Sequence, residues 1–262
     1  MSCTVVTAYY KFPSKHSAEN YDAWMQNMLS LDCPMVIFTD DENADKIRTY
    51  RGEKMLKTLI WVMPLSDCFY AQEPFLKTWE QHWKMDYERY IHNPNLYIIW
   101  NEKTMFVQKV IERNPFGSEF FCWCDIGCFR NRDEMRLFTE SWPATAFLEG
   151  ADKNKMYFLN IEPFQDRDLE ILPNSLTRPF DGKNRIGGTI FLGHKDIFEE
   201  YNKVFYKYLV LYIREGYFAG KDQNIIATIY AAHPDKFKLI KPVTGQGDPW
   251  FYLQRFFNQA PA

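Results

Sequence analysis

The spacing of hydrophobic positions changes twice within the first forty residues. Residues 4–10 (TVVTAYY) are β-branched and aromatic, which predicts a strand. Residues 14–31 carry apolar side chains three and four positions apart, which places them on one face of a helix. Residues 35–39 (MVIFT) are an unbroken apolar run, typical of a strand buried on both faces. Strand, helix and strand in this order predict a βαβ unit and an α/β fold.

The same alternation continues through the rest of the chain. Short apolar runs predict further strands, and wider amphipathic stretches predict helices. The predicted strands are residues 59–62, 120–124, 156–159, 188–192 and 237–240, and the predicted helices are residues 75–91, 101–113, 195–217 and 222–232.

Composition describes a globular chain without an overall basic surplus. Of its 262 residues 46% are hydrophobic and 25% are charged, which excludes intrinsic disorder. No repeat or long linker interrupts it, so we expect one compact domain over residues 1–262. The net charge of −3 argues against a nucleic-acid partner. Phe, Tyr and Trp supply 18% of the residues, which suits a thick core or a site that stacks on rings.

The start of the chain and its cysteines bear on location. The first residues lack the charged and apolar regions of a signal peptide, and no apolar run approaches the roughly 20 residues of a membrane span. Six cysteines are too few for a disulfide scaffold. We therefore expect a cytoplasmic protein without a transmembrane segment. Cys122, Cys124 and Cys128 lack paired C-x2-C zinc spacing, and small buried side chains explain them better.

One strand ends on a residue that could bind a ligand. The run over residues 120–124 is followed by Asp125 and then Gly127. In open α/β sheets, ligands bind beyond the carboxyl ends of strands. A carboxylate there can hold a divalent ion that bridges phosphate oxygens, and a glycine lets the backbone pass close to a ligand. A turn-forming aspartate explains Asp125 equally well. Dinucleotide, P-loop, zinc-protease and serine-hydrolase motifs are missing from the sequence.

The order of short motifs along the chain resembles the HtrL/YibB family, whose members look like glycosyltransferases of the GT-A type. The resemblance spans most of the chain, and each motif alone is weak. Its motifs are residues 4–10 (TVVTAYY), 36–40 (VIFTD), 101–103 (NEK), 114–116 (NPF), 123–127 (WCDIG), 186–193 (IGGTIFLG) and 221–223 (KDQ).

The resemblance implies a single GT-A-like domain with a mixed, mostly parallel central sheet. Residues 1–130 would form the nucleotide-binding half, and residues 131–262 the acceptor side. The implied reaction moves a sugar from a nucleotide-sugar donor, a UDP-sugar by preference, to a glycan or other hydroxyl acceptor. The implied cofactor is a divalent cation, Mn²⁺ or Mg²⁺.

The metal motif of GT-A enzymes is only half present. That motif is Asp-X-Asp, and here the second acidic position is Gly127. The resemblance therefore implies that Asp125 alone binds the metal and the donor diphosphate. Either a second metal ligand comes from elsewhere in the chain, or the enzyme does not depend on a metal. Asp248 is one candidate for that ligand, although it could equally form a turn. His233 is the other, although a surface histidine at a helix end explains it better.

Further donor-binding candidates follow from the resemblance. Thr7 and Ala8 end the first strand, where a uridine pocket usually lies, although both could belong to the core. Asp40 could meet the base or ribose, or form a turn. Lys103, near the start of a predicted helix, could neutralise phosphates or be a solvated lysine. Arg130, like Arg132 after it, could serve the phosphates too.

The acceptor side takes its candidates from the last third of the chain. Gly187 and Gly188 could let the backbone approach a sugar, or could reflect tight strand packing. Asp222 could be the base that deprotonates the acceptor hydroxyl, or the N-cap of a helix. Gln223 follows it, and Trp250 could cover the site or pack as part of the core.

Two other functions remain open from sequence. A nucleotidyltransferase can share this sheet, but it usually has a Gly-rich basic loop after the first strand, where this chain reads Tyr-Tyr-Lys-Phe-Pro at residues 9–13. A non-catalytic carbohydrate-binding module would use the aromatic residues as a binding surface. Slow hydrolysis of a donor separates a transferase from such a module.

Overall fold

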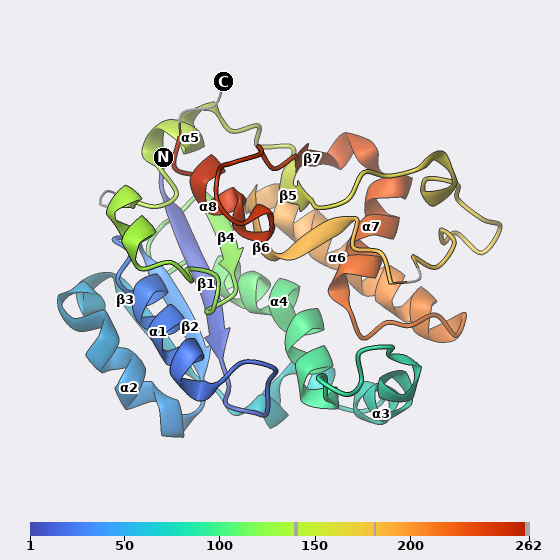
Figure 1. Ribbon diagram of the computed structural model, residues 1–262, viewed down its shortest axis with the longest axis horizontal. Coiled ribbons are helices and arrows are strands. Elements are labelled where there is room, and N and C mark those ends of the chain that lie inside the picture. Colours follow the sequence, from blue (N-terminus) through green and yellow to red (C-terminus); the bar gives the residue numbers. More distant parts are fainter. Residues whose placement is uncertain (139–140, 181, 260–262) are drawn as a thin grey trace.

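A computed structural model describes residues 1–138, 141–180 and 182–259. Its centre is a seven-stranded sheet in the order β3-β2-β1-β4-β6-β5-β7 (Figure 1). The pairs along β3, β2, β1 and β4 are parallel, β6 is antiparallel to both β4 and β5, and β5 pairs parallel with β7. The strands are β1 Cys3–Tyr9, β2 Met35–Thr39, β3 Thr58–Val62, β4 Phe120–Cys124, β5 Met156–Asn160, β6 Ile186–His194 and β7 Phe237–Ile240. The expected mixed, mostly parallel sheet is confirmed.

Helices cover both faces of this sheet, as the two hydrophobic clusters show. One cluster joins the sheet to α3, α4, α6 and α7, and the other joins it to α1, α2, α5 and α8. In the described residues no helix is both long and apolar enough to cross a membrane. The helices are α1 Ala18–Leu29, α2 Asp41–Arg51, α3 Phe75–Met85, α4 Pro94–Arg113, α5 Thr145–Gly150, α6 Lys195–Arg214, α7 Asp222–Ala232 and α8 Leu253–Phe256.

The order of strands creates a switch point between β1 and β4. From β1 the chain moves to β2 on one side, and it later returns to pair β4 with the other side of β1. Chain direction diverges at this point, so the loops after β1 and β4 leave a crevice between them. The carboxyl ends of these two strands are therefore where a ligand site is expected.

The alternation of side chains along β4 aims one residue at α4. Phe121 and Trp123 belong to the cluster on the α4 side of the sheet, whereas Phe120, Cys122 and Cys124 belong to the other cluster. Phe106 of α4 stacks on Trp123, with ring centroids 5.9 Å apart and planes within 8°. Two positions after Trp123, Asp125 continues toward the same helix.

Four predicted ranges coincide with the structure, and other predictions need correction. The matches are β2, β4, β7 and α7. The structure adds α2, a polar helix that the pattern did not indicate, and the predicted helix over residues 75–91 ends at Met85. Helix α4 begins at Pro94 rather than residue 101, because the side chain of Asn93 caps it by accepting from the Leu96 N–H at 3.3 Å.

Candidate functional site

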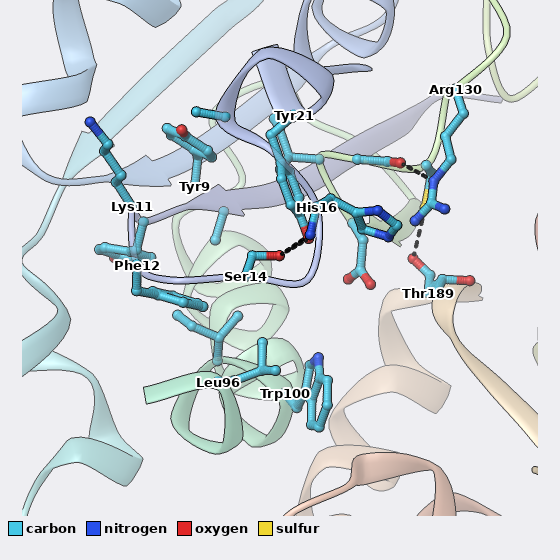
Figure 2. A pocket seen from close by; sticks show the side chains of 18 of the residues that line it. Tyr9, Lys11, Phe12, Ser14, His16, Tyr21, Leu96, Trp100, Arg130 and Thr189 are labelled. Carbon is cyan, nitrogen blue, oxygen red and sulfur yellow. Dashed lines mark hydrogen bonds between the residues drawn. The ribbon is translucent and has the colours of Figure 1, made fainter. Parts of the chain in front are cut away.

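A pocket of about 620 Å³ opens at the carboxyl ends of β1 and β4 (Figure 2). Residues 8–14, from the end of β1 and the loop after it, and residues 125–128 after β4 form two of its walls. Helix α4 adds Leu96 and Trp100, and strand β6 adds Thr189. The pocket therefore occupies the crevice at the switch point of the sheet.

Aromatic and cationic side chains dominate the lining. The end of β1 and the loop after it place Tyr9 and Phe12 on the pocket, Tyr21 joins them from α1, and Trp100 lines it from α4 (Figure 2). Lys11 and Arg130 bring positive charge to the same space, and His16 adds an imidazole whose pKa burial lowers. Flat rings beside cations suit a ligand that combines an aromatic base with anionic groups.

Asp125 is the acidic residue in this lining, and its carboxylate is held from the protein side. Trp123 Nε1 donates to Asp125 Oδ1 at 2.6 Å, and Lys103 Nζ lies 3.3 Å from the same oxygen. Among the described residues no hydrogen bond is made to Oδ2. The side chain is 31% exposed, so it reaches both the protein interior and the pocket.

Lys103 is buried, which corrects the alternative of a solvated helix lysine. It lies in the middle of α4, rather than near its start, and its side chain is 3% exposed. Its Nζ donates to the Gly188 carbonyl at 2.8 Å and lies 3.0 Å from Asp222 Oδ2, besides its contact with Asp125. Burial alone would lower the pKa of Lys103, but the two carboxylates raise it above its ordinary value, so the lysine stays charged.

Lys103 therefore makes one hydrogen bond, to the Gly188 carbonyl, and two ion pairs, with Asp125 and Asp222. It is also not part of the pocket lining. The expected direct contact between Lys103 and donor phosphates is therefore not what this geometry provides. The lysine instead joins Asp125 to Asp222.

Asp222 lies inside the protein rather than at the end of α7 as a cap. The N-cap of that helix is Lys221, and Asp222 is its first helical residue, so the N-cap alternative is wrong. Its side chain is 6% exposed, and burial raises the pKa of Asp222 above its ordinary value although Lys103 opposes the shift. Asp222 does not line the pocket.

Gly188 is a glycine because of Asp222. A Cβ at this position would stand 2.6 Å from Asp222 Oδ2, closer than side chains approach in folded proteins. The expected close approach of the backbone is present, but the group that approaches is this carboxylate. Gly187 instead packs against the side chains of Leu159 and Ile161.

Three other predicted residues lie outside the pocket. Thr7 is buried beside Met28, so the core alternative is the correct one. Asp40 caps α2, and its Oδ1 accepts from the Asn43 N–H at 3.1 Å. Gln223 donates from Nε2 to the Ile186 carbonyl at 3.0 Å. Ala8 and Gly127, by contrast, line the pocket as expected.

Arg130 lies at the edge of the pocket between two rings. Its guanidinium carbon is 4.2 Å from the centroid of Trp24 and 4.7 Å from that of Phe251. Its Nε donates to the Gly127 carbonyl at 3.2 Å. Phe251, rather than the predicted Trp250, is the aromatic residue that the C-terminal segment brings to the pocket.

Potential metal ligands lie in two separate places. Asp86, Glu88 and His92 form the one group of three or more such side chains among the described residues. These side chains already bind one another and their neighbours: Asp86 Oδ2 contacts His92 Nδ1 and the Tyr97 hydroxyl, each at 2.7 Å, and Glu88 pairs with Lys221. Asp125 stands apart as the pocket carboxylate.

The other predicted metal ligands have structural roles. Asp248 accepts from the Trp250 N–H at 2.9 Å and lines a neighbouring, smaller pocket. His233 ends α7 with its ring edge-on to Tyr208, which fits the alternative of a helix-end histidine. Burial raises the pKa of Cys122 and Cys124 well above the ordinary value, so both remain thiols in the core.

Sequence reasoning missed the residues that make most of the pocket surface. The loop over residues 10–14 and the Trp100 and Phe251 rings are examples. For the loop a signal was available, because the strand predicted over residues 4–10 ends at Tyr10 and its carboxyl end was expected at the site. The sequence does not give the order of the strands. A residue that follows one strand therefore cannot be assigned to the same pocket as a residue of α4.

A family model described as "Bacterial protein of unknown function (HtrL_YibB)" matches residues 1–259. No curated protein matches the chain. Among solved structures, core-mannan synthase A from Aspergillus fumigatus in its Mn/GDP form is 12% identical, with a TM-score of 0.50. The alignment covers 92% of this chain and 73% of that one. This likeness shows the GT-A nucleotide-diphospho-sugar transferase fold.

A second similar structure is the apo form of mouse xyloside xylosyltransferase 1. It is 9% identical with a TM-score of 0.48, and the alignment covers 100% of this chain and 94% of that one. A cytidylyltransferase from Leptospira borgpetersenii is 7% identical with a TM-score of 0.39, over 91% of this chain and 74% of that one.

Proposed function

The chain belongs to the HtrL/YibB family, and we propose that it is a glycosyltransferase that moves a sugar from a nucleotide-sugar donor to a hydroxyl acceptor. One observation carries the proposal: a pocket at the switch point of a GT-A sheet, lined by aromatic rings and cations, with a single carboxylate at Asp125. The expected division into a donor half over residues 1–130 and an acceptor half after it is part of this proposal.

The donor nucleotide would lie among the rings after β1. The rings of Tyr9 and Trp100 could stack on the base, and the small residues Ala8 and Gly127 leave room beside it. The guanidinium group of Arg130 could bind phosphate oxygens. UDP-sugars are the first donors to test. The anionic diphosphate would then lie toward Asp125 and Arg130.

The residues at the pocket fit a divalent cation shared with the diphosphate. Mg²⁺ commonly takes one or two protein carboxylates and completes its shell with substrate phosphates and waters. Asp125 lines the pocket, and its Oδ2 has no hydrogen-bond partner among the described residues, while Trp123 and Lys103 contact Oδ1. A bound Mn²⁺ or Mg²⁺ would neutralise charge on the leaving diphosphate.

Asp222 and Lys103 support Asp125 from behind. Transfer forms a bond between the acceptor oxygen and the anomeric carbon, and breaks the bond between that carbon and the diphosphate oxygen. The hydroxyl proton must pass to a base in contact with the acceptor. Asp222 is bound to Lys103 and outside the pocket lining, so we assign it a positioning role instead of the role of base.

Donor hydrolysis tests the proposal without a known acceptor. We would incubate the purified chain with UDP-, GDP- and CMP-sugars, with and without Mn²⁺, and measure release of the nucleotide product. The proposal expects slow release from one donor, and its loss in Asp125→Asn. Asp45→Asn is the matched control, because Asp45 is an exposed acid on α2 that pairs with Arg48.

Two results would count against the proposal. Equal release by Asp125→Asn and the wild type would remove Asp125 from the donor site. Tight nucleotide-sugar binding without any release would favour the non-catalytic binding module.

A further inference from the structure

A second, smaller pocket lies beside the first and shares a wall with it. It measures about 180 Å³, and Cys128, Arg130 and Phe251 line both pockets. The far side consists of residues after β4, the loop over residues 246–248, and α8. A ligand here would lie directly across Arg130 and Phe251 from a ligand in the first pocket.

One residue that lines this pocket has a side-chain hydrogen-bond donor without a partner. Gln254 is 7% exposed. Its backbone carbonyl accepts a hydrogen bond from Trp142 Nε1 at 2.9 Å, which holds the backbone of this residue in place. Its side-chain Nε2 is buried and has no hydrogen-bond partner among the described residues. Buried amide groups in folded proteins almost always have a partner. Gln254 therefore lines the pocket with an amide that the protein's own groups do not saturate.

The charges around this pocket balance. Glu134 pairs with Arg255 at 2.9 Å, and Asn131 donates to the other oxygen of Glu134 at 3.0 Å. Asp248 and Arg130 also line the pocket. Two acids and two arginines leave no net charge, which favours a neutral ligand over a phosphate or a carboxylate.

The mixture of groups suits a sugar ring. Carboxylates accept from hydroxyls, amides and guanidinium groups donate to them, and the face of Phe251 can pack on C–H groups. A volume of about 180 Å³ holds about six waters at ~30 Å³ each. That is the scale of a single ring.

We propose that this second pocket is the acceptor subsite and holds one neutral sugar ring, with the side chain of Gln254 among the groups that contact it. The inference deepens the proposed glycosyltransferase function and rests on it. It places the acceptor on one side of Arg130 and Phe251 and the donor on the other. The two substrates then meet at the shared wall.

Direct binding of simple sugars tests the subsite without turnover. Saturation-transfer NMR would probe the full chain with methyl glycosides of hexoses, pentoses and N-acetylhexosamines. The wild type should bind at least one of them, and Gln254→Met should weaken that binding about tenfold or more. Gln26→Met is the matched control, since Gln26 is exposed on α1 and bonds only to Asp22. It should bind as the wild type does.

A second variant covers the case in which Gln254→Met does not fold. Gln246 is half-buried on the rim of the same pocket, so Gln246→Met should also weaken binding. The inference is overturned if no glycoside binds the wild type, or if the folded variants bind as tightly as it does.

Nucleotide binding, measured in the same samples, separates the two proposals. Unchanged nucleotide affinity with weakened glycoside binding supports the subsite. Failure of every nucleotide to bind the wild type would contradict the glycosyltransferase function itself. Intact nucleotide binding without any glycoside effect would contradict the subsite alone.

Discussion

The carboxylate of Asp222 occupies the space that a side chain at Gly188 would need. A Cβ on Gly188 would stand 2.6 Å from Asp222 Oδ2 and 2.9 Å from Oδ1. The same Oδ2 lies 3.0 Å from Lys103 Nζ, which also binds the Gly188 carbonyl. Strand β6, helix α7 and helix α4 therefore meet at one buried ion pair, and this pair supports Asp125 at the pocket.

Gly188→Ala should displace the Asp222 carboxylate. The added methyl group cannot fit beside it, so we expect a loss of about 1–3 kcal/mol in the free energy of unfolding, together with lower donor turnover. Urea unfolding and donor hydrolysis measure the two effects. Gly187→Ala is the neighbouring control, because its Cβ would meet side chains at 3.4 Å, and it should change both much less.

Lys103→Met should be strongly destabilising. It leaves the buried Asp222 carboxylate without its cation, and breaking such a pair by removing one partner costs about 3–5 kcal/mol. Chemical unfolding of the variant checks this loss.

The double variant Lys103→Met/Asp222→Asn separates the ion pair from general packing. Because it also removes the uncompensated charge, it should recover part of the lost stability. Equal stability of Lys103→Met and the wild type would mean that the cation does not hold this site together.

Glu102 should make the stability depend on pH. Burial raises the pKa of Glu102 to about 7, although the Tyr70 and Phe69 N–H groups donate to its carboxylate. The folded state thus binds this proton more tightly than the unfolded state. Its contribution is full below the unfolded pKa of about 4.5 and is lost as pH rises toward 7.

Glu102→Gln cannot titrate and should lack this slope. Between pH 5 and 7.5 the wild type should lose on the order of 2 kcal/mol relative to the variant, at ~1.4 kcal/mol per pKa unit. Urea unfolding of both proteins at several pH values provides the comparison. Parallel pH profiles would show that Glu102 keeps an ordinary pKa.

The central parallel strands could be predicted because each is a continuous apolar run. Met35–Thr39 and Phe120–Cys124 are buried on both faces, and no other element competes for such a pattern. Helix α2 was missed because its sequence is mostly polar. Only two of its apolar residues, Ala44 and Ile47, are buried, which is too few to show a helical pattern. Its burial depends on a sheet whose order the sequence does not state.

The site could be predicted only where it lies next to a strand end. Asp125 follows β4 directly, so the general position of ligands in α/β sheets indicated it. The burial of Lys103 could not be predicted in this way. Its two carboxylates come from residues 22 and 119 positions further along the chain, and only the folded sheet brings them together.

Nucleotide binding at Asp125 tests the central claim most directly. A thermal-shift series would use UDP, GDP and CMP with and without Mn²⁺, on the wild type, Asp125→Asn and the control Asp45→Asn. A ligand at 100 times its Kd should add about 2.7 kcal/mol of stability. The account predicts a rise in Tm with one nucleotide for the wild type and the control, and its loss in Asp125→Asn. No rise with any nucleotide, or an equal rise in Asp125→Asn, would contradict it.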